Sequence, residues 1–223
     1  MSRARGLGVV AHATALLVAI ATAILAGQPI YANDTWIHLA LGEAFVAAGP
    51  WLAADPHLFT APGPPSPSSW LGSAALFEAW SLLGFTGLRI VHVLLVVAIL
   101  ALAWRLVRRA SASAAIASAA LVVFTVLATY RFVQLRPDLF TMAATLVLHP
   151  LLFEPRSGPG GRRIVAAALL TAVWSNVHAA FLLGPLLVLG TSAAVAIASI
   201  LPGRTLAAAD AGPAARERER GRA

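Results

Sequence analysis

The chain has 223 residues, of which 59% are hydrophobic and only 11% are charged, and its net charge is +7. A soluble domain usually carries about 25% charged residues, so the composition excludes an ordinary soluble protein and excludes disorder for most of the chain. All 16 basic residues are arginines, and the absence of cysteine excludes disulfide bonds, zinc–thiolate sites and a cysteine nucleophile.

Long apolar runs predict membrane-spanning helices. The first run, residues 7–27, contains no charged residue and is long enough to cross the ~30 Å hydrocarbon core of a bilayer as a helix. A cleaved signal peptide, with Ala21–Ala23 as its small-residue site, is the alternative for this run. Backbone groups in lipid must bond within their own segment, which favours helices for every run.

We therefore predict an all-α, polytopic transmembrane bundle of about six spans within residues 1–203. The predicted spans are residues 7–27, 88–104, 112–130, 137–153, 164–176 and 179–201. Residues 204–223, rich in Arg and Glu, are predicted to form a disordered cytoplasmic tail.

The predicted loop between the first two spans, residues 28–87, is far longer than a connector requires, which is typical of a functional loop. A helix is expected to start at residues 33–35 and to end at Gly49. A second is expected over residues 70–83, stopped by the glycines that follow it. Both are apolar and contain tryptophan, which favours a position in the membrane interface.

The arginines predict the orientation of the bundle. With the N-terminus in the cytoplasm, 13 of the 16 arginines fall on the cytoplasmic side, as the positive-inside rule requires. The other three, Arg89, Arg131 and Arg136, face an external loop whose charged residues are all acidic. The excess of positive charge thus indicates orientation, and we expect membrane lipid, and no nucleic acid, as a partner.

Two carboxylates of this loop have two readings each. Asp34 is either the N-cap of the predicted helix or a functional residue, and His38 lies on the same helical face because it is four residues away. Asp55 precedes Pro56 and is either a turn former or a second functional carboxylate.

Two further polar groups fall at the same predicted face. Arg131 and Arg136, with Arg89, either extend to lipid headgroups or clamp a phosphate. Asn176 and His178 interrupt an apolar segment. They are either functional residues or residues that form hydrogen bonds between packed helices. Together with the two carboxylates, these residues predict an interfacial site for an anionic, membrane-borne substrate.

Five short segments, in this order, resemble motifs of the GT-C class of bacterial polytopic glycosyltransferases. They are D-x-W-x-H-x-x-x-G at 34–42, D-P-x-x-F-T-A-P-G at 55–63, W-L at 70–71, R-P-x-x-F at 136–140 and W-x-N-x-H-x-x-F-x-x-G at 174–184. Any one of them is weak, whereas five in order between about residues 10 and 190 are fairly specific.

The resemblance implies a multi-pass enzyme of the bacterial inner (plasma) membrane that transfers a sugar from a polyprenyl-phosphate donor. It assigns the role of base, or of acceptor-orienting carboxylate, to Asp34, with Asp55 second. Substrate binding falls to His38, Arg89, Arg131, Arg136, Asn176 and His178. Some members bind a divalent metal, for which Asp34 and His38 are candidate ligands; a hard cation needs more oxygen ligands than these two supply.

The sequence departs from the class in three places. Ala179 replaces the glycine that usually follows the histidine, and Ser68 and Ser69 stand where more polar or acidic residues are expected. The class also has more spans, so the resemblance covers its N-terminal part. A truncated reading frame, half of a split protein completed by a second polypeptide, and a degenerate relative are the three readings of this difference. A non-catalytic assembly subunit and a small transporter remain alternative functions.

Overall fold

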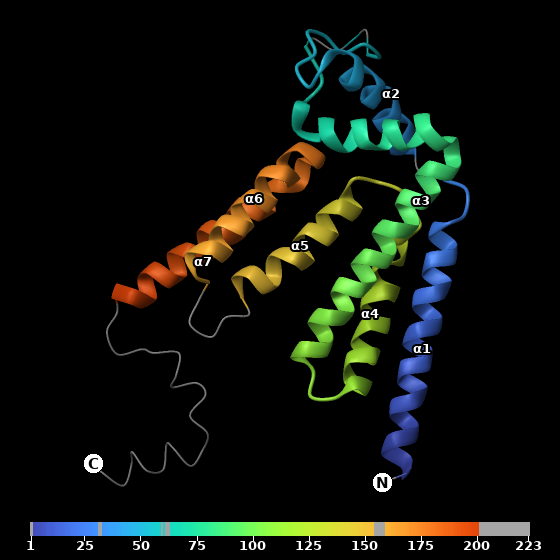
Figure 1. Ribbon diagram of the computed structural model, residues 1–223, viewed down its shortest axis with the longest axis vertical. Helices are drawn as coiled ribbons and strands as arrows, with labels where there is room; N and C mark the ends of the chain where they lie inside the picture. The colour runs from blue at the N-terminus through green and yellow to red at the C-terminus, as the bar shows by residue number, and fades with distance from the viewer. Residues whose placement is uncertain (1, 31–32, 59, 61–62, 154–158, 201–223) are drawn as a thin grey trace.

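The computed structural model describes residues 2–30, 33–58, 60, 63–153 and 159–200, and this part of the chain is helical without a β-strand (Figure 1). The prediction of an all-α fold is confirmed. The helices are α1 (Ser2–Ala26), α2 (Asn33–Ala48), η1 (Pro67–Ser69), α3 (Trp70–Ala110), α4 (Ala114–Phe132), α5 (Asp138–Leu152), α6 (Gly161–Val177), η2 (Ala179–Leu182) and α7 (Leu183–Ile200).

Within the described residues, four helical segments are long and apolar enough to cross a membrane: Gly6–Ala26, Pro67–Ala110, Ala114–Phe132 and Ala179–Ile197. They correspond to four of the six predicted spans. The other two correspond to α5 and α6, which have 15 and 17 residues and are shorter than the ~20 residues a span usually needs. The chain is thus a helical membrane protein by length and composition, with two shorter helices packed among the long ones.

α3 contains both the predicted loop helix and the second predicted span, joined at a sharp bend. Gly84 has φ 58° and ψ −145° inside this helix, a conformation that L-residues with a Cβ rarely adopt. The part before the bend, Trp70–Leu83, lies across one end of the bundle beside α2, whereas the part after it runs along α4 (Figure 1). The helical conformation is interrupted at Gly84, which confirms the predicted end of the loop helix, and the chain changes direction there.

Apart from α2 and the crosswise part of α3, the main helices form two packed groups. In one group, α1, the second part of α3 and α4 share an apolar core that includes Val96, Ile99 and Phe132. In the other, α5, α6 and α7 pack around Leu148 and Trp174. α5 also contacts α3, and so it joins the two groups (Figure 1).

Two glycines allow the crosswise helices to approach their neighbours closely. A Cβ on Gly42 of α2 would lie 2.3 Å from the carbonyl oxygen of Ser73 in α3, and a Cβ on Gly72 would lie 2.4 Å from that of Val177 in α6. Both distances are far inside van der Waals contact, so only glycine fits. These contacts bring α2, α3 and the end of α6 together at one end of the bundle.

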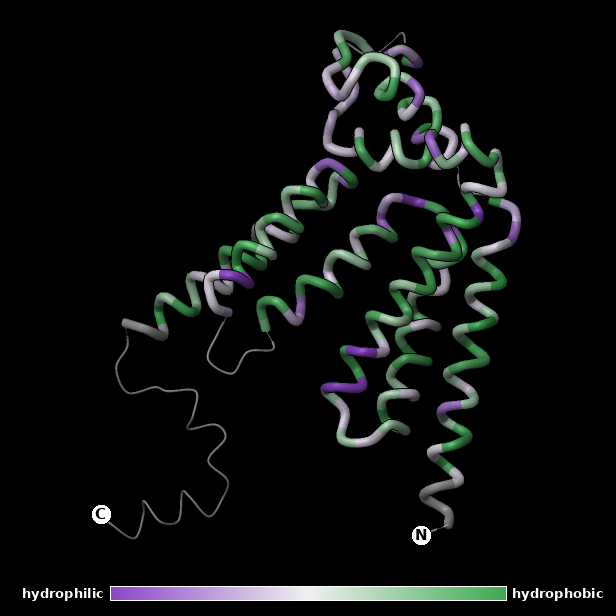
Figure 2. Tube along the Cα trace, viewed as in Figure 1, coloured by the Kyte–Doolittle hydropathy of each residue, from purple (hydrophilic) through white to green (hydrophobic). Residues whose placement is uncertain are grey.

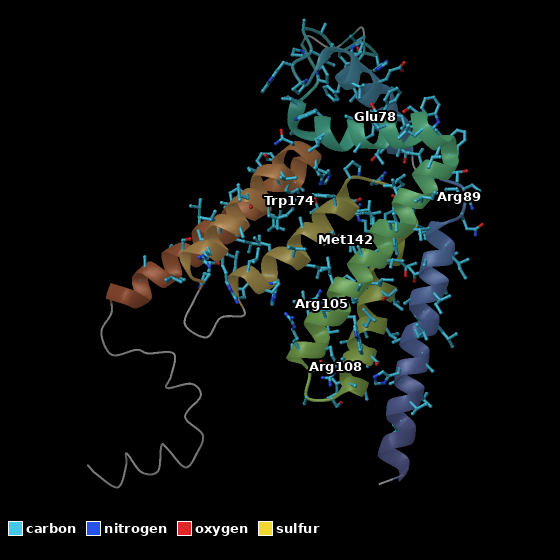
Figure 3. All side chains as sticks on the ribbon, viewed as in Figure 1. Glu78, Arg89, Arg105, Arg108, Met142 and Trp174 are labelled. Atoms are coloured by element: carbon cyan, nitrogen blue, oxygen red, sulfur yellow. The ribbon has the colours of Figure 1, made fainter. Side chains whose placement is uncertain are left out.

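Charged residues lie mainly near the two ends of the bundle. Figure 2 shows hydrophilic residues in the link between α4 and α5 and near helix ends, while the helices are mostly hydrophobic along their length. Arg105 and Arg108 lie at the opposite end of α3 from Glu78 (Figure 3). This is the segregation on which the predicted orientation rests; the membrane side that each end faces stays a prediction. The predicted disordered tail lies outside the described residues.

Candidate functional site

Asp34 lies in the first turn of α2 and forms an ion pair with Arg136 from the link between α4 and α5. The distance from Asp34 Oδ2 to Arg136 Nη2 is 3.0 Å, and the side chains are 47% and 27% exposed. Beside this pair, the buried Thr35 hydroxyl donates to the carbonyl oxygen of Leu135 at 2.7 Å. The start of α2 is therefore fixed against the link, and the Asp34 carboxylate remains accessible.

His38, one turn further along α2, is held by α3. Its Nδ1 lies 2.9 Å from the hydroxyl of Ser73, which is fully buried. Burial lowers the pKa of His38; the Asp34 carboxylate opposes this shift, and His178 and Arg136 add to it. The lowered pKa favours the neutral form of His38 over the charged form.

The end of α6 places Asn176 and His178 against two other helices. The Trp70 indole N–H, at the start of α3, donates to Asn176 Oδ1 at 2.8 Å. His178 Nδ1 lies 2.7 Å from the hydroxyl of Thr141 in α5, and the Trp174 indole N–H donates to the same hydroxyl at 2.9 Å. Both predicted residues thus make contacts between helices, at the end of the bundle that also carries α2.

The link between α4 and α5 concentrates polar atoms without partners. Of the described residues, four have a buried side-chain nitrogen or oxygen with no hydrogen-bond partner, and three of them are in or beside this link: Gln134 Oε1, Arg136 Nε and Asp138 Oδ1. Buried polar atoms are rarely left unpaired in native proteins, so these atoms mark the link as a candidate for contact with water or a polar ligand.

Arg131 lies at the edge of this arrangement. Its guanidinium forms an ion pair with Asp138 at 3.0 Å, is half-exposed, and lies over the ring of Tyr130 at 5.8 Å from the ring centre. Burial lowers the pKa of His178, and the Asp138 carboxylate opposes that shift. Arg131 is thereby connected to the His178 side of the site through Asp138.

Two predicted residues are used elsewhere. Asp55 Oδ1 accepts hydrogen bonds from the backbone N–H groups of His57 at 2.8 Å and Leu58 at 3.0 Å, which is the turn-forming role. Arg89, exposed next to the bend of α3 (Figure 3), donates from Nε to the carbonyl oxygen of Gly27 and so caps the end of α1. Neither forms an ion pair or hydrogen bond with another predicted site residue in the described part of the chain.

A metal site is not assembled from the residues present. Across the described ranges, no group of three or more His, Asp or Glu side chains is placed to hold a metal ion. Asp34 and His38 remain a pair, and the Asp34 carboxylate is engaged by Arg136. The donor set therefore does not fit a divalent cation.

The sequence patterns missed three hydroxyl residues that hold the site together: Thr35, Ser73 and Thr141. Each belongs to a helix of ordinary apolar composition, and each bonds to a residue at least 35 positions away. The sequence feature that could have indicated two of them is their position, because Thr35 and Thr141 each directly follow a motif residue. Their partners are not deducible from spacing.

No family model, no curated protein and no solved structure matches this chain.

Proposed function

We propose that the chain is a membrane-embedded glycosyltransferase module that transfers a sugar from a polyprenyl-phosphate donor, at the end of the bundle that carries α2. The observation that carries the proposal is the ion pair between Asp34 and Arg136. It joins an accessible carboxylate and a partly exposed guanidinium at the end of apolar helices. Transfer of a sugar from a lipid phosphate requires a base for the acceptor and a positive charge for the phosphate that leaves, and this pair supplies both.

Asp34 is the base of the proposed reaction. The hydroxyl oxygen of the acceptor bonds to the anomeric carbon of the sugar, and its proton passes to the Asp34 carboxylate. The bond from the same carbon to the phosphate oxygen breaks, and the lipid phosphate leaves with the electron pair. The exposure of Asp34 supports this role because an acceptor can reach the carboxylate.

Arg136 stabilises the phosphate that leaves. Its contact with Asp34 uses Nη2, while its buried Nε has no partner among the described residues. A guanidinium carries five N–H donors, so donors remain for phosphate oxygens. Positioned donors of this kind stabilise charge that develops in the transition state. Arg131, half-exposed at the edge of the site, is a second cation for the same phosphate.

The surroundings of the site suit a donor with a lipid tail. Trp36 in α2, Trp51 after it and Trp80 in the crosswise part of α3 are all exposed at this end of the bundle. Tryptophan is enriched where proteins meet the membrane–water interface. The phosphate of a polyprenyl donor lies at that level while its chain lies in the bilayer, which agrees with a site at the ends of the spans.

Transfer of labelled sugar tests the proposal. Purified protein in liposomes is incubated with a panel of radiolabelled polyprenyl-phosphate sugars, and the Asp34→Asn variant is compared with wild type. We expect Asp34→Asn to lose at least about 100-fold in rate, the usual contribution of a general base. Glu43→Gln is the matched control, because Glu43 is an exposed carboxylate of the same helix, and it should retain full activity. Equal transfer by Asp34→Asn and wild type removes Asp34 from the reaction. No transfer by wild type with any donor of the panel contradicts the proposed function.

A further inference from the structure

The indole N–H of Trp174 is fully buried and donates a hydrogen bond to a hydroxyl. Trp174 lies between α6 and α5 (Figure 3), is 0% exposed, and directs its indole N–H to Thr141 Oγ at 2.9 Å. Indole nitrogen donates and never accepts. In this contact, the Thr141 oxygen must therefore be the acceptor.

The Thr141 hydroxyl differs from the hydroxyls of six other helical threonines in the bond it makes. Those six donate to the carbonyl oxygen four residues earlier in their own helix: Thr22, Thr125, Thr129, Thr145, Thr171 and Thr191. The Thr141 hydroxyl makes no such bond within the described structure. Its two contacts are with Trp174 and with His178 Nδ1.

These contacts determine where the proton of the Thr141 hydroxyl goes. A hydroxyl has one hydrogen to donate and two positions to accept, and Trp174 fills an accepting position. If His178 Nδ1 donated instead, the Thr141 oxygen would accept twice and its own proton would have no acceptor within hydrogen-bond distance in the described structure. With Nδ1 as the acceptor, that proton is paired at 2.7 Å, the usual length for a hydroxyl donor. In a neutral imidazole one nitrogen accepts and the other donates. A proton that points at Nδ1 therefore requires the ring proton to be on Nε2.

We propose that Trp174 and Thr141 hold neutral His178 in the tautomer that is protonated at Nε2, so that this histidine offers the site a hydrogen-bond donor and no base. Thr141 and Trp174 are positioning residues, since they act through His178. The His178 backbone N–H also donates to the carbonyl oxygen of Trp174 at 3.1 Å. The backbone of His178 is thus fixed by the last turn of α6 and its ring by Thr141 of α5.

A fixed tautomer divides the roles within the site. A neutral His178 protonated at Nε2 donates to an oxygen of an anionic substrate, and it accepts no proton from a hydroxyl at that nitrogen. This step rests on the proposed function, where the substrate oxygen belongs to the donor phosphate or its sugar, and it leaves Asp34 as the proton acceptor. The tautomer itself depends only on Trp174 and Thr141.

Nitrogen NMR of the histidine ring tests the tautomer directly. The full chain, labelled with ¹⁵N-histidine, is measured in lipid nanodiscs at pH 8 without any substrate, and the difference from the His178→Gln variant identifies the His178 signals. We expect a protonated Nε2 and an unprotonated Nδ1. A ring protonated at Nδ1 overturns the proposal. Because no donor is present, this result does not depend on whether the protein transfers a sugar.

Two variants of Thr141 test the cause. Thr141→Val removes the hydroxyl and should shift the ratio of the two His178 tautomers by roughly fivefold, the effect of one net hydrogen bond. Thr141→Ser keeps the hydroxyl and should preserve the wild-type signal. Thr145→Val is the matched control, because the Thr145 hydroxyl bonds to its own helix one turn away, and it should leave His178 unchanged. An unchanged tautomer ratio in a folded Thr141→Val protein overturns the role of Thr141. If that variant does not fold, the wild-type tautomer and the Thr141→Ser variant decide the question.

Discussion

The indole N–H of Trp70 donates to the side-chain oxygen of Asn176 at 2.8 Å and so ties the first residue of α3 to the last turn of α6. The two residues are far apart in the sequence, and each belongs to a different GT-C-like motif. Their contact joins the crosswise part of α3 to the group formed by α5, α6 and α7.

Loss of the Trp70 hydrogen bond should loosen the end of α6. Trp70→Phe keeps most of the ring but leaves Asn176 Oδ1 without its donor, so we expect the free energy of unfolding to fall by about 1 kcal/mol. Thermal unfolding in detergent, followed by circular dichroism, measures this. Trp80→Phe is the control, because Trp80 is exposed and packs against Phe77; an equal loss in both variants would contradict a specific role for the bond.

The close approach of α3 to α6 should not tolerate a methyl group. In Gly72→Ala the new Cβ would meet the backbone oxygen of Val177 at 2.4 Å, so the helices must separate, and a loss of about 1–3 kcal/mol in unfolding free energy is expected. The same melting experiment applies. Gly190→Ala in α7, where a Cβ meets nothing within 4 Å, should be neutral or stabilising, since alanine favours helix over glycine.

The bend at Gly84 should depend on backbone conformation alone. A Cβ at this position would have open space around it, yet φ is +58°, so Gly84→Ala pays for strain without any clash. We expect a loss of about 1–3 kcal/mol in unfolding free energy. Stability equal to that of wild type would mean that the bend does not need the left-handed conformation.

The ion pair between Asp34 and Arg136 should matter more for activity than for stability. Both side chains are partly exposed, and pairs of this kind contribute about 1 kcal/mol or less. Arg136→Gln is therefore expected to melt close to wild type while its rate of sugar transfer falls by at least about 100-fold. A double-mutant cycle with Asp34→Asn checks the stability part. A coupling energy of several kcal/mol would show that the pair is structural instead.

Acid should destabilise the protein through His38. Its pKa is lowered in the folded state, first by burial, so the unfolded chain takes up the proton at about pH 6.5 and the folded protein only at lower pH. Unfolding then binds a proton, and the free energy of unfolding falls as the pH drops below about 6.5. Melting temperatures from pH 8 to pH 5 measure this. His38→Gln should show a smaller decline than wild type over the same range, and an identical decline would contradict the assignment.

Several features of the fold follow from the sequence because they depend on local composition. Long uncharged runs determine where helices form, since backbone groups in lipid bond only within their own segment. The predicted boundaries of α2 and α4 lie within about two residues of those in the structure. The end of the bundle to which each arginine belongs likewise follows from the order of the helices along the chain. Local chemistry also identified Asp34, His38, Arg136, Asn176 and His178 as residues that gather at one end.

The contacts between distant segments were decided by the tertiary structure. The tertiary structure set the change of direction at Gly84 between the loop helix and the second span. It also placed Asp55 in a turn and Arg89 at the end of a helix. Thr141 and Ser73 became partners of the two histidines. A carboxylate caps a helix, closes a turn or pairs with an arginine with similar ease. Its neighbours in space, which the sequence does not display, select among these roles.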